Sequence, residues 1–109
     1  GWAIAYKNRF WQKSKFDGIE IIRKAVKEAY GVDDDGKEKV SLVNVSLRWL
    51  MKHSKLGKDD GVIMGPSTVK YYNDNLEAME CNDDLDERVV KAIDEAWNMA
   101  KGDCPVYFR

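Results

Sequence analysis

"DGVIMGPSTVKYYNDNL", residues 60–76, contains a short apolar run between two glycines, a Pro-Ser-Thr turn and the start of a segment with helical spacing. The apolar run, residues 62–64, has no polar alternation, which is typical of a strand covered on both faces in a parallel sheet. After the turn, apolar side chains recur every three or four residues, and Ser67 or Thr68 is a suitable N-cap. The segment therefore predicts strand, turn and helix, the order in which α/β proteins hold phosphate groups.

Two helices are predicted upstream of this segment. Apolar side chains in residues 16–30 follow helical spacing, and Gly31 stands where a left-handed residue ends a helix. Residues 41–54 predict a second helix with Ser41 as its N-cap. Because this second helix is apolar around much of its circumference, we expect it to be largely buried.

The two ends of the chain predict different structures. Residues 1–15 mix aromatic and cationic side chains without a clear period, which predicts an ordered loop. Asp84 followed by Glu87 resembles a capping box, and it predicts a last helix that ends at Gly102. Residues 104–109 then form a short tail.

The chain is thus expected to contain four helices and a single strand. An internal strand without neighbours would leave backbone N–H and C=O groups unpaired, at a cost of about 1 to 3 kcal/mol each. The simplest solution is that the neighbouring strands lie on further polypeptide. We therefore predict that these residues are the last part of a larger α/β protein.

The composition restricts the class of protein. The chain has 109 residues, 44% of them hydrophobic, which suits one globular domain. A formal net charge of -1 favours neither a nucleic acid nor a membrane surface as partner. Cys81 and Cys104 form no CxxC or metal-type cluster, and no secretory or membrane-spanning run is present. We predict no metal site and a reducing, cytoplasmic location.

Few residues suggest chemistry by themselves. At the turn, Gly65 allows close approach of a ligand, and Ser67 offers a hydroxyl beside the free N–H groups of a helix start, which suits an anion. The same pattern also occurs in turns that only cap a helix. His53 is predicted to be a helix-end residue, since it lacks a catalytic partner. Tyr6 and Arg9 are three apart and would face one cavity if they were helical.

Three motifs resemble a known family. "AYKNRFW" resembles "TYRNRFW", "SLRWLMKHS" resembles "ALRWMYHHS", and "CPVYFR" resembles "CPNYFR" in the aflatoxin aldehyde (succinic semialdehyde) reductase subfamily of the aldo-keto reductases. In addition, "VIMGPSTVKYYNDNL" resembles the eighth strand, phosphate-binding turn and eighth helix of that subfamily. The four segments occur in the same order, and the resemblance covers essentially the whole chain.

The resemblance implies an α/β fold, the C-terminal part of a (β/α)8 barrel, which typically has about 250 residues. Residues 1–15 would be a substrate loop, residues 61–80 the last strand with its phosphate turn and helix, and residues 103–109 the C-terminal tail. The predicted strand would then pair with the first and seventh strands. The remainder of the barrel is thus an expected partner, and a homodimer is one alternative for the oligomeric state.

The resemblance also implies that NADPH is the cofactor, with its adenosine and 2′-phosphate end at the turn. The cofactor-binding residues carried over by position are Gly65, Ser67, Thr68, Tyr71, Asp74 and Asn75. Tyr71 stands where the family has Arg or Gln, so it can stack on adenine but supplies no positive charge. Lys70 is a nearby substitute for that charge, and Pro66 replaces a small residue or Met.

The implied substrate is a small aldehyde, including aldehydes that bear a carboxylate or a second carbonyl group. Tyr6, Arg9 and Arg109 would line its pocket, and a guanidinium suits a carboxylate because it can bind it with two hydrogen bonds. The catalytic Asp, Tyr, Lys and His of the family have no counterpart in this chain. The chain would therefore supply cofactor and substrate contacts to an aldehyde reductase, but not the proton transfer.

Two other functions remain open at this point. The chain could be a self-contained helical interaction module derived from such an enzyme. It could also belong to a catalytically silent barrel that senses the redox state of a nicotinamide cofactor.

Overall fold

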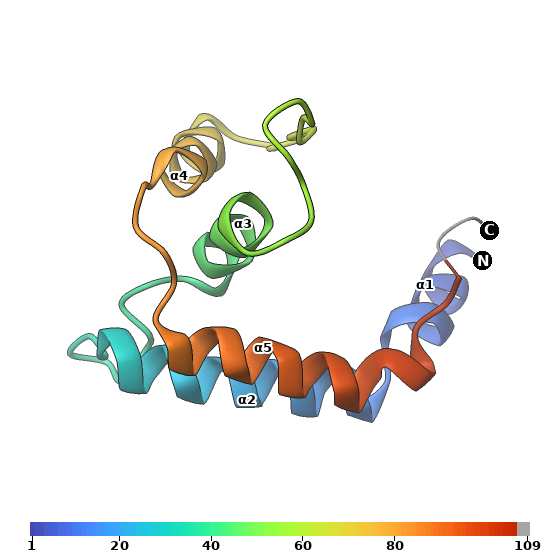
Figure 1. The fold of residues 1–109 in the computed structure, drawn as a ribbon. Coiled ribbons are helices and arrows are strands. Elements are labelled where there is room, and N and C mark those ends of the chain that lie inside the picture. The colour runs from blue at the N-terminus through green and yellow to red at the C-terminus, as the bar shows by residue number, and fades with distance from the viewer. Residues whose placement is uncertain (107–109) are drawn as a thin grey trace.

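The computed structural model describes residues 1–106 and shows a helical arrangement (Figure 1). The elements, in chain order, are α1 (Trp2–Phe10), α2 (Lys13–Tyr30), α3 (Leu42–Lys52), α4 (Val69–Glu80), α5 (Glu87–Ala100) and the 3-10 helix η1 (Lys101–Asp103). Within the described residues there is no strand, and the one β-type contact is an isolated bridge between Val32 and Glu38. Arg109 lies outside the described residues.

Helices α2 and α5 form a closely packed antiparallel pair (Figure 1). Small side chains allow the close approach, since a Cβ atom placed on Gly18 would lie 3.2 Å from the Cβ of Ala96. Val26 and Val89 are 0% exposed in this interface. A hydrogen bond between the side chains of Ser14 and Asp103 joins one end of the pair. The pair is the most completely packed part of the chain.

Helix α3 contributes Val45 to the same core, and α4 packs beside α3 (Figure 1). The two N-caps are as predicted, because Ser41 accepts a hydrogen bond from the Asn44 N–H at 3.0 Å and Thr68 accepts one from the Tyr71 N–H at 3.1 Å. Such caps satisfy donors that have no partner within the helix. The prediction of helices over residues 41–54 and after the turn is confirmed.

The α4–α5 connection, residues 81–86, is held by side chains from two other helices. The Arg48 guanidinium donates to the carbonyl oxygens of Asp83 and Asp84, both at 3.3 Å. His53 Nε2 accepts the N–H of Leu85 at 3.1 Å, and the Tyr30 hydroxyl accepts the N–H of Asp86 at 2.9 Å. We refer to Tyr30, Arg48 and His53 as the connection clamp.

Two predictions about helices are wrong in detail. Residues 1–15 do not form a loop, because residues 2–10 are helical; this segment has no glycine or proline after Gly1, and its backbone bonds close locally without burial of any side chain. The last helix is capped by Asp86 and not by Asp84. Asp86 Oδ1 accepts the N–H of Arg88 at 2.9 Å, whereas the Asp84 carbonyl faces Arg48.

Two predictions about burial are also wrong. Residues 61–65 have no regular secondary structure and form no strand, and Ile63 is 99% exposed, since the described residues offer this segment no partner strand. Helix α3 is not largely buried: Val45 and Arg48 are its buried residues, while Val43 and Met51 are exposed. Residues 61–65 and helix α3 therefore expose to solvent apolar side chains that the sequence analysis predicted to be buried.

Candidate functional site

A long groove of about 950 Å³ runs between α3 and α4. One wall consists of residues from the start of α3 and the segment before it, including Lys39, Ser41 and Asn44. The other wall follows successive turns of α4. The turn before α4 contributes Gly65, Pro66 and Ser67 to this wall. One face of α4 and its C-cap contribute Lys70, Tyr71, Asp74, Asn75, Glu77 and Cys81.

The predicted cofactor residues converge on this groove. Five of them line it, namely Gly65, Ser67, Tyr71, Asp74 and Asn75. The sixth, Thr68, is the N-cap of α4, and its hydroxyl is occupied by the N–H of Tyr71. Ser67 precedes that cap, at the helix end where free N–H groups and the positive end of the dipole favour an anion.

The lysine nearest to Tyr71 is already paired. Lys70 Nζ lies 2.7 Å from Asp74 Oδ2, one turn further along α4. This hydrogen bond, together with the carboxylate charge, raises the pKa of Lys70 above its ordinary value. The charge that Lys70 could lend in place of an arginine at position 71 is therefore balanced by Asp74 in this structure.

Arg48 is a groove residue that the sequence analysis did not single out. It is only 8% exposed, it lies with its guanidinium 5.7 Å from the centre of the Tyr30 ring, and its Nε has no hydrogen-bond partner. One wall of the groove is thus backed by a buried cation that also holds the α4–α5 connection. A single charged residue within the mostly apolar "LVNVSLRWL" was the signal that could have identified it.

The predicted substrate residues Tyr6 and Arg9 lie on α1, away from the groove (Figure 1). The Tyr6 and Phe10 ring centres are 4.9 Å apart, and the Arg9 guanidinium lies 5.7 Å from the Phe10 ring centre. The two residues therefore share one aromatic and cationic cluster, but α1 buries no side chain. Arg109, the third predicted substrate residue, falls outside the described residues.

The remaining polar candidates have structural contacts. His53 ends α3 as predicted, and its ring accepts the N–H of Leu85. Cys81 and Cys104 are both free thiols.

Residues 1–106 contain no group of three or more His, Cys, Asp or Glu side chains placed to hold a metal ion. No helix in the described part of the chain is both long and apolar enough to span a membrane.

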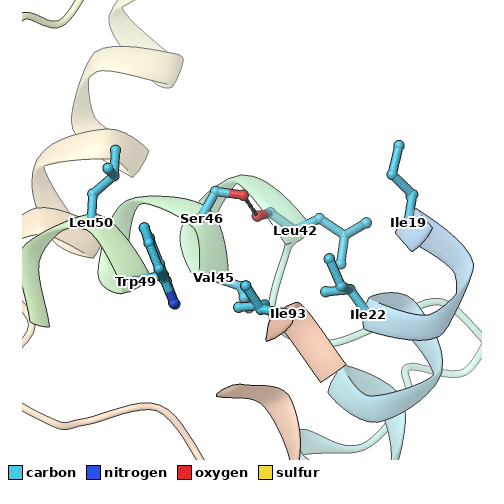
Figure 2. Close-up of a pocket in the computed structure, with 8 residues that line it drawn as sticks. All are labelled: Ile19, Ile22, Leu42, Val45, Ser46, Trp49, Leu50 and Ile93. Atoms are coloured by element: carbon cyan, nitrogen blue, oxygen red, sulfur yellow. Dashed lines mark hydrogen bonds between the residues drawn. The ribbon is translucent and has the colours of Figure 1, made fainter. Parts of the chain in front are cut away.

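A second, apolar pocket of about 300 Å³ lies where α2, α3 and α5 meet (Figure 2). Its lining residues include Ile19, Ile22, Trp49 and Ile93. The hydroxyl of Ser46, which also lines the pocket, donates a hydrogen bond to the Leu42 carbonyl oxygen. A pocket lined in this way offers an apolar surface and few groups that could orient a polar ligand.

The chain belongs to the aldo/keto reductase family, because residues 5–98 match the model of that family. It is 38% identical to aflatoxin B1 aldehyde reductase member 2 of Mus musculus and 37% identical to aldo-keto reductase family 7 member A3 of Homo sapiens. Both alignments cover 99% of this chain. The resemblance to aflatoxin aldehyde reductases is therefore confirmed.

The same alignments cover only 28% of the mouse protein and 31% of the human protein. The chain thus spans about a third of the length of these relatives or less. The family is one of oxidoreductases, and its fold implies a barrel of which the observed helices can form a part.

Proposed function

We propose that this chain forms the C-terminal part of an NADPH-dependent aldehyde reductase with a (β/α)8 barrel. Its role is to bind the adenosine and 2′-phosphate end of the cofactor in the α3–α4 groove. The observation that carries the proposal is the convergence of Gly65, Ser67, Tyr71, Asp74 and Asn75 on one groove at the start of α4. Family membership and the similarity to aflatoxin B1 aldehyde reductases support it.

The groove has the chemistry that an adenosine phosphate needs. The first turn of α4 offers N–H donors and a positive dipole end to a phosphate, and Ser67 adds a hydroxyl donor. The Tyr71 ring gives an aromatic face to adenine, and the side chains of Asp74 and Asn75 offer acceptors to its amino group. When bound, the cofactor supplies the hydride that reduces a carbonyl group.

The exposed apolar surfaces support the barrel as the context of this groove. Ile63 is 99% exposed, and the apolar pocket in Figure 2 opens beside α3. Large exposed apolar patches mark surfaces that other polypeptide covers. In the proposed barrel, residues 61–65 join the sheet, and the apolar side chains of α3 pack on it.

Substrate binding is proposed for Tyr6, Arg9 and Arg109. A pair of guanidinium groups would hold the carboxylate of a substrate such as succinic semialdehyde and leave its aldehyde for reduction. The cluster of Tyr6, Arg9 and Phe10 on α1 supports a common role for the first two residues. The acid that protonates the product is proposed to lie on the rest of the barrel.

The test is NADPH consumption with succinic semialdehyde by the longer protein that contains this chain. We expect turnover by that protein and none by residues 1–109 alone. In the longer protein, Ser67→Ala should weaken NADPH binding about ten- to hundred-fold through loss of one hydrogen bond to a charged group, with little change in stability. Turnover by residues 1–109 alone, or NADPH binding unchanged by Ser67→Ala, would contradict the proposal.

A further inference from the structure

The α3–α4 groove contains a cation on the wall opposite Tyr71. Lys39 lines the groove two residues before the N-cap of α3, and Ser67 lines it two residues before the first helical residue of α4. Within residues 1–106 no carboxylate oxygen lies within 4.0 Å of the Lys39 ammonium group, since the ion pairs found are formed by other residues. Lys39 is therefore the groove lysine whose charge is not already balanced.

The starts of α3 and α4 lie at the same end of the groove. At the other end, Arg48 of α3 and His53, the C-cap of that helix, contact residues 83–85 in the connection that follows α4. The C-terminal ends of the two helices are thus close together. Their N-terminal turns also lie on one side, because residues from both helix starts, such as Asn44 and Lys70, line the same groove. Two positive dipole ends therefore point to the part of the groove that holds Lys39 and Ser67.

The backbone around Lys39 is anchored. Its N–H donates to the Gly31 carbonyl at 3.1 Å, and the neighbouring Val32 and Glu38 form a β-type bridge. The Glu38 carboxylate, in turn, lies 3.6 Å from the Arg23 guanidinium on α2. The base of the Lys39 side chain is consequently held against α2, although the side chain itself is exposed.

The other charges in the groove are committed or distant. Lys70 is paired with Asp74, and Arg48 is buried against the carbonyl oxygens of Asp83 and Asp84. Glu77 is ten residues beyond Ser67, which corresponds to about 15 Å along a helix. Near the helix starts, the groove therefore has a net attraction for an anion, and Lys39 is its free positive charge.

Building on the proposed function, we infer that Lys39 supplies the positive charge that Tyr71 lacks and selects a nucleotide that bears a 2′-phosphate. It does so from across the groove, on the segment before α3, and not from the turn that holds the phosphate. The ligand class is an adenosine nucleotide with a phosphomonoester on its ribose.

The experiment measures binding of adenosine 2′,5′-bisphosphate and of 5′-AMP to the longer protein by calorimetry. Lys39→Met keeps the length of the side chain and removes its charge. We expect this change to weaken binding of the bisphosphate about three- to five-fold and to leave binding of 5′-AMP within about two-fold, as suits one solvent-exposed charge contact. Lys37→Met is the matched control, because Lys37 is exposed on the same segment and does not line the groove.

The outcomes distinguish a failure of the proposed function from a failure of the role inferred for Lys39. If the unaltered protein binds neither nucleotide, the proposed function and the role of Lys39 both fail. If it binds both but Lys39→Met changes neither affinity, or weakens the two equally, the groove is retained and the role of Lys39 is wrong. A loss equal to that in Lys37→Met would likewise overturn it. Urea unfolding of both variants shows whether the fold is preserved.

Discussion

The α2–α5 pair and the α3–α4 pair bury their helices in different ways. Between α2 and α5, Val26 and Val89 are completely buried, and Gly18 and Ala96 allow the two backbones to approach closely. Along α3 and α4, a groove of about 950 Å³ separates much of the two helices. The first pair is held by packing of small apolar side chains, whereas polar contacts to the α4–α5 connection hold the second pair in place. A closely packed helix pair and a helix pair with a groove thus lie side by side in one short chain.

Val89→Asp should break the α2–α5 pair and is expected to have the largest effect. It places an unpaired carboxylate in a site without solvent contact, so the free energy of unfolding should fall by more than about 4 kcal/mol. Urea unfolding followed by circular dichroism measures this change. Val69→Asp is the control, because Val69 is exposed at the start of α4. Equal losses in the two variants would show that α2 and α5 do not form the closely packed pair.

Arg48→Met should loosen the second pair with an intermediate effect. The carbonyl oxygens of Asp83 and Asp84 lose their donor, while most of the side-chain volume remains, so we expect a loss of about 1 to 3 kcal/mol. Hydrogen exchange should become faster at Leu85, whose N–H is bonded to His53 within the connection clamp. In Lys52→Met, an exposed change on the same helix, both quantities should stay near those of the unaltered protein. Arg48 would not be part of the clamp if its variant behaved like Lys52→Met.

Asp86→Asn should have the smallest effect, a small loss of stability at neutral pH that disappears in acid. Hydrogen bonds from the Arg88 side chain, followed by the Arg88 backbone N–H, lower the pKa of Asp86 below its ordinary value of 3.8. A lowered pKa contributes stability that is present above the ordinary value and is lost as the pH falls through the lowered one. Asn also caps helices but does not titrate in this range. Stability of the variant should therefore depend less steeply on pH below about pH 4 than that of the unaltered protein.

Unfolding midpoints measured between about pH 5 and pH 2 test the Asp86 prediction. A steeper or unchanged slope in Asp86→Asn would show that the cap does not contribute to acid sensitivity. Because Tyr30 contacts the N–H of Asp86 and not its carboxylate, the connection clamp should be intact in this variant.

The sequence predicted the helices that carry an amphipathic pattern and a cap. Gly31 ends α2 with a φ of 87°, and Ser41 and Thr68 cap α3 and α4, because these positions depend on local backbone geometry. Helix α1 was missed because it has apolar and cationic side chains on all sides and buries none of them. The spacing of apolar residues therefore predicted those helices that pack on other helices of the chain.

The groove was predicted only in part. Gly65, Ser67 and Tyr71 came from the resemblance to a family, and the structure brings them together with Asp74 and Asn75. Lys39 and Arg48 were missed because they are distant in sequence and reach the groove through tertiary packing of α3. The strand over residues 61–65 could not form in the described residues, since a strand needs hydrogen-bonding neighbours that are not part of them.

The connection clamp also has a consequence for the order of folding. Its three side chains lie far in sequence from the backbone groups they bind, with separations of 32 residues for His53, 35 and 36 for Arg48 and 56 for Tyr30. Contacts of such separation form slowly because a long loop must close first, whereas helices form locally and early. During synthesis, the Tyr30 hydroxyl cannot accept its hydrogen bond from the Asp86 N–H until Asp86 has left the ribosome. The C-terminal end of the groove is therefore expected to be among the last features of this chain to assemble.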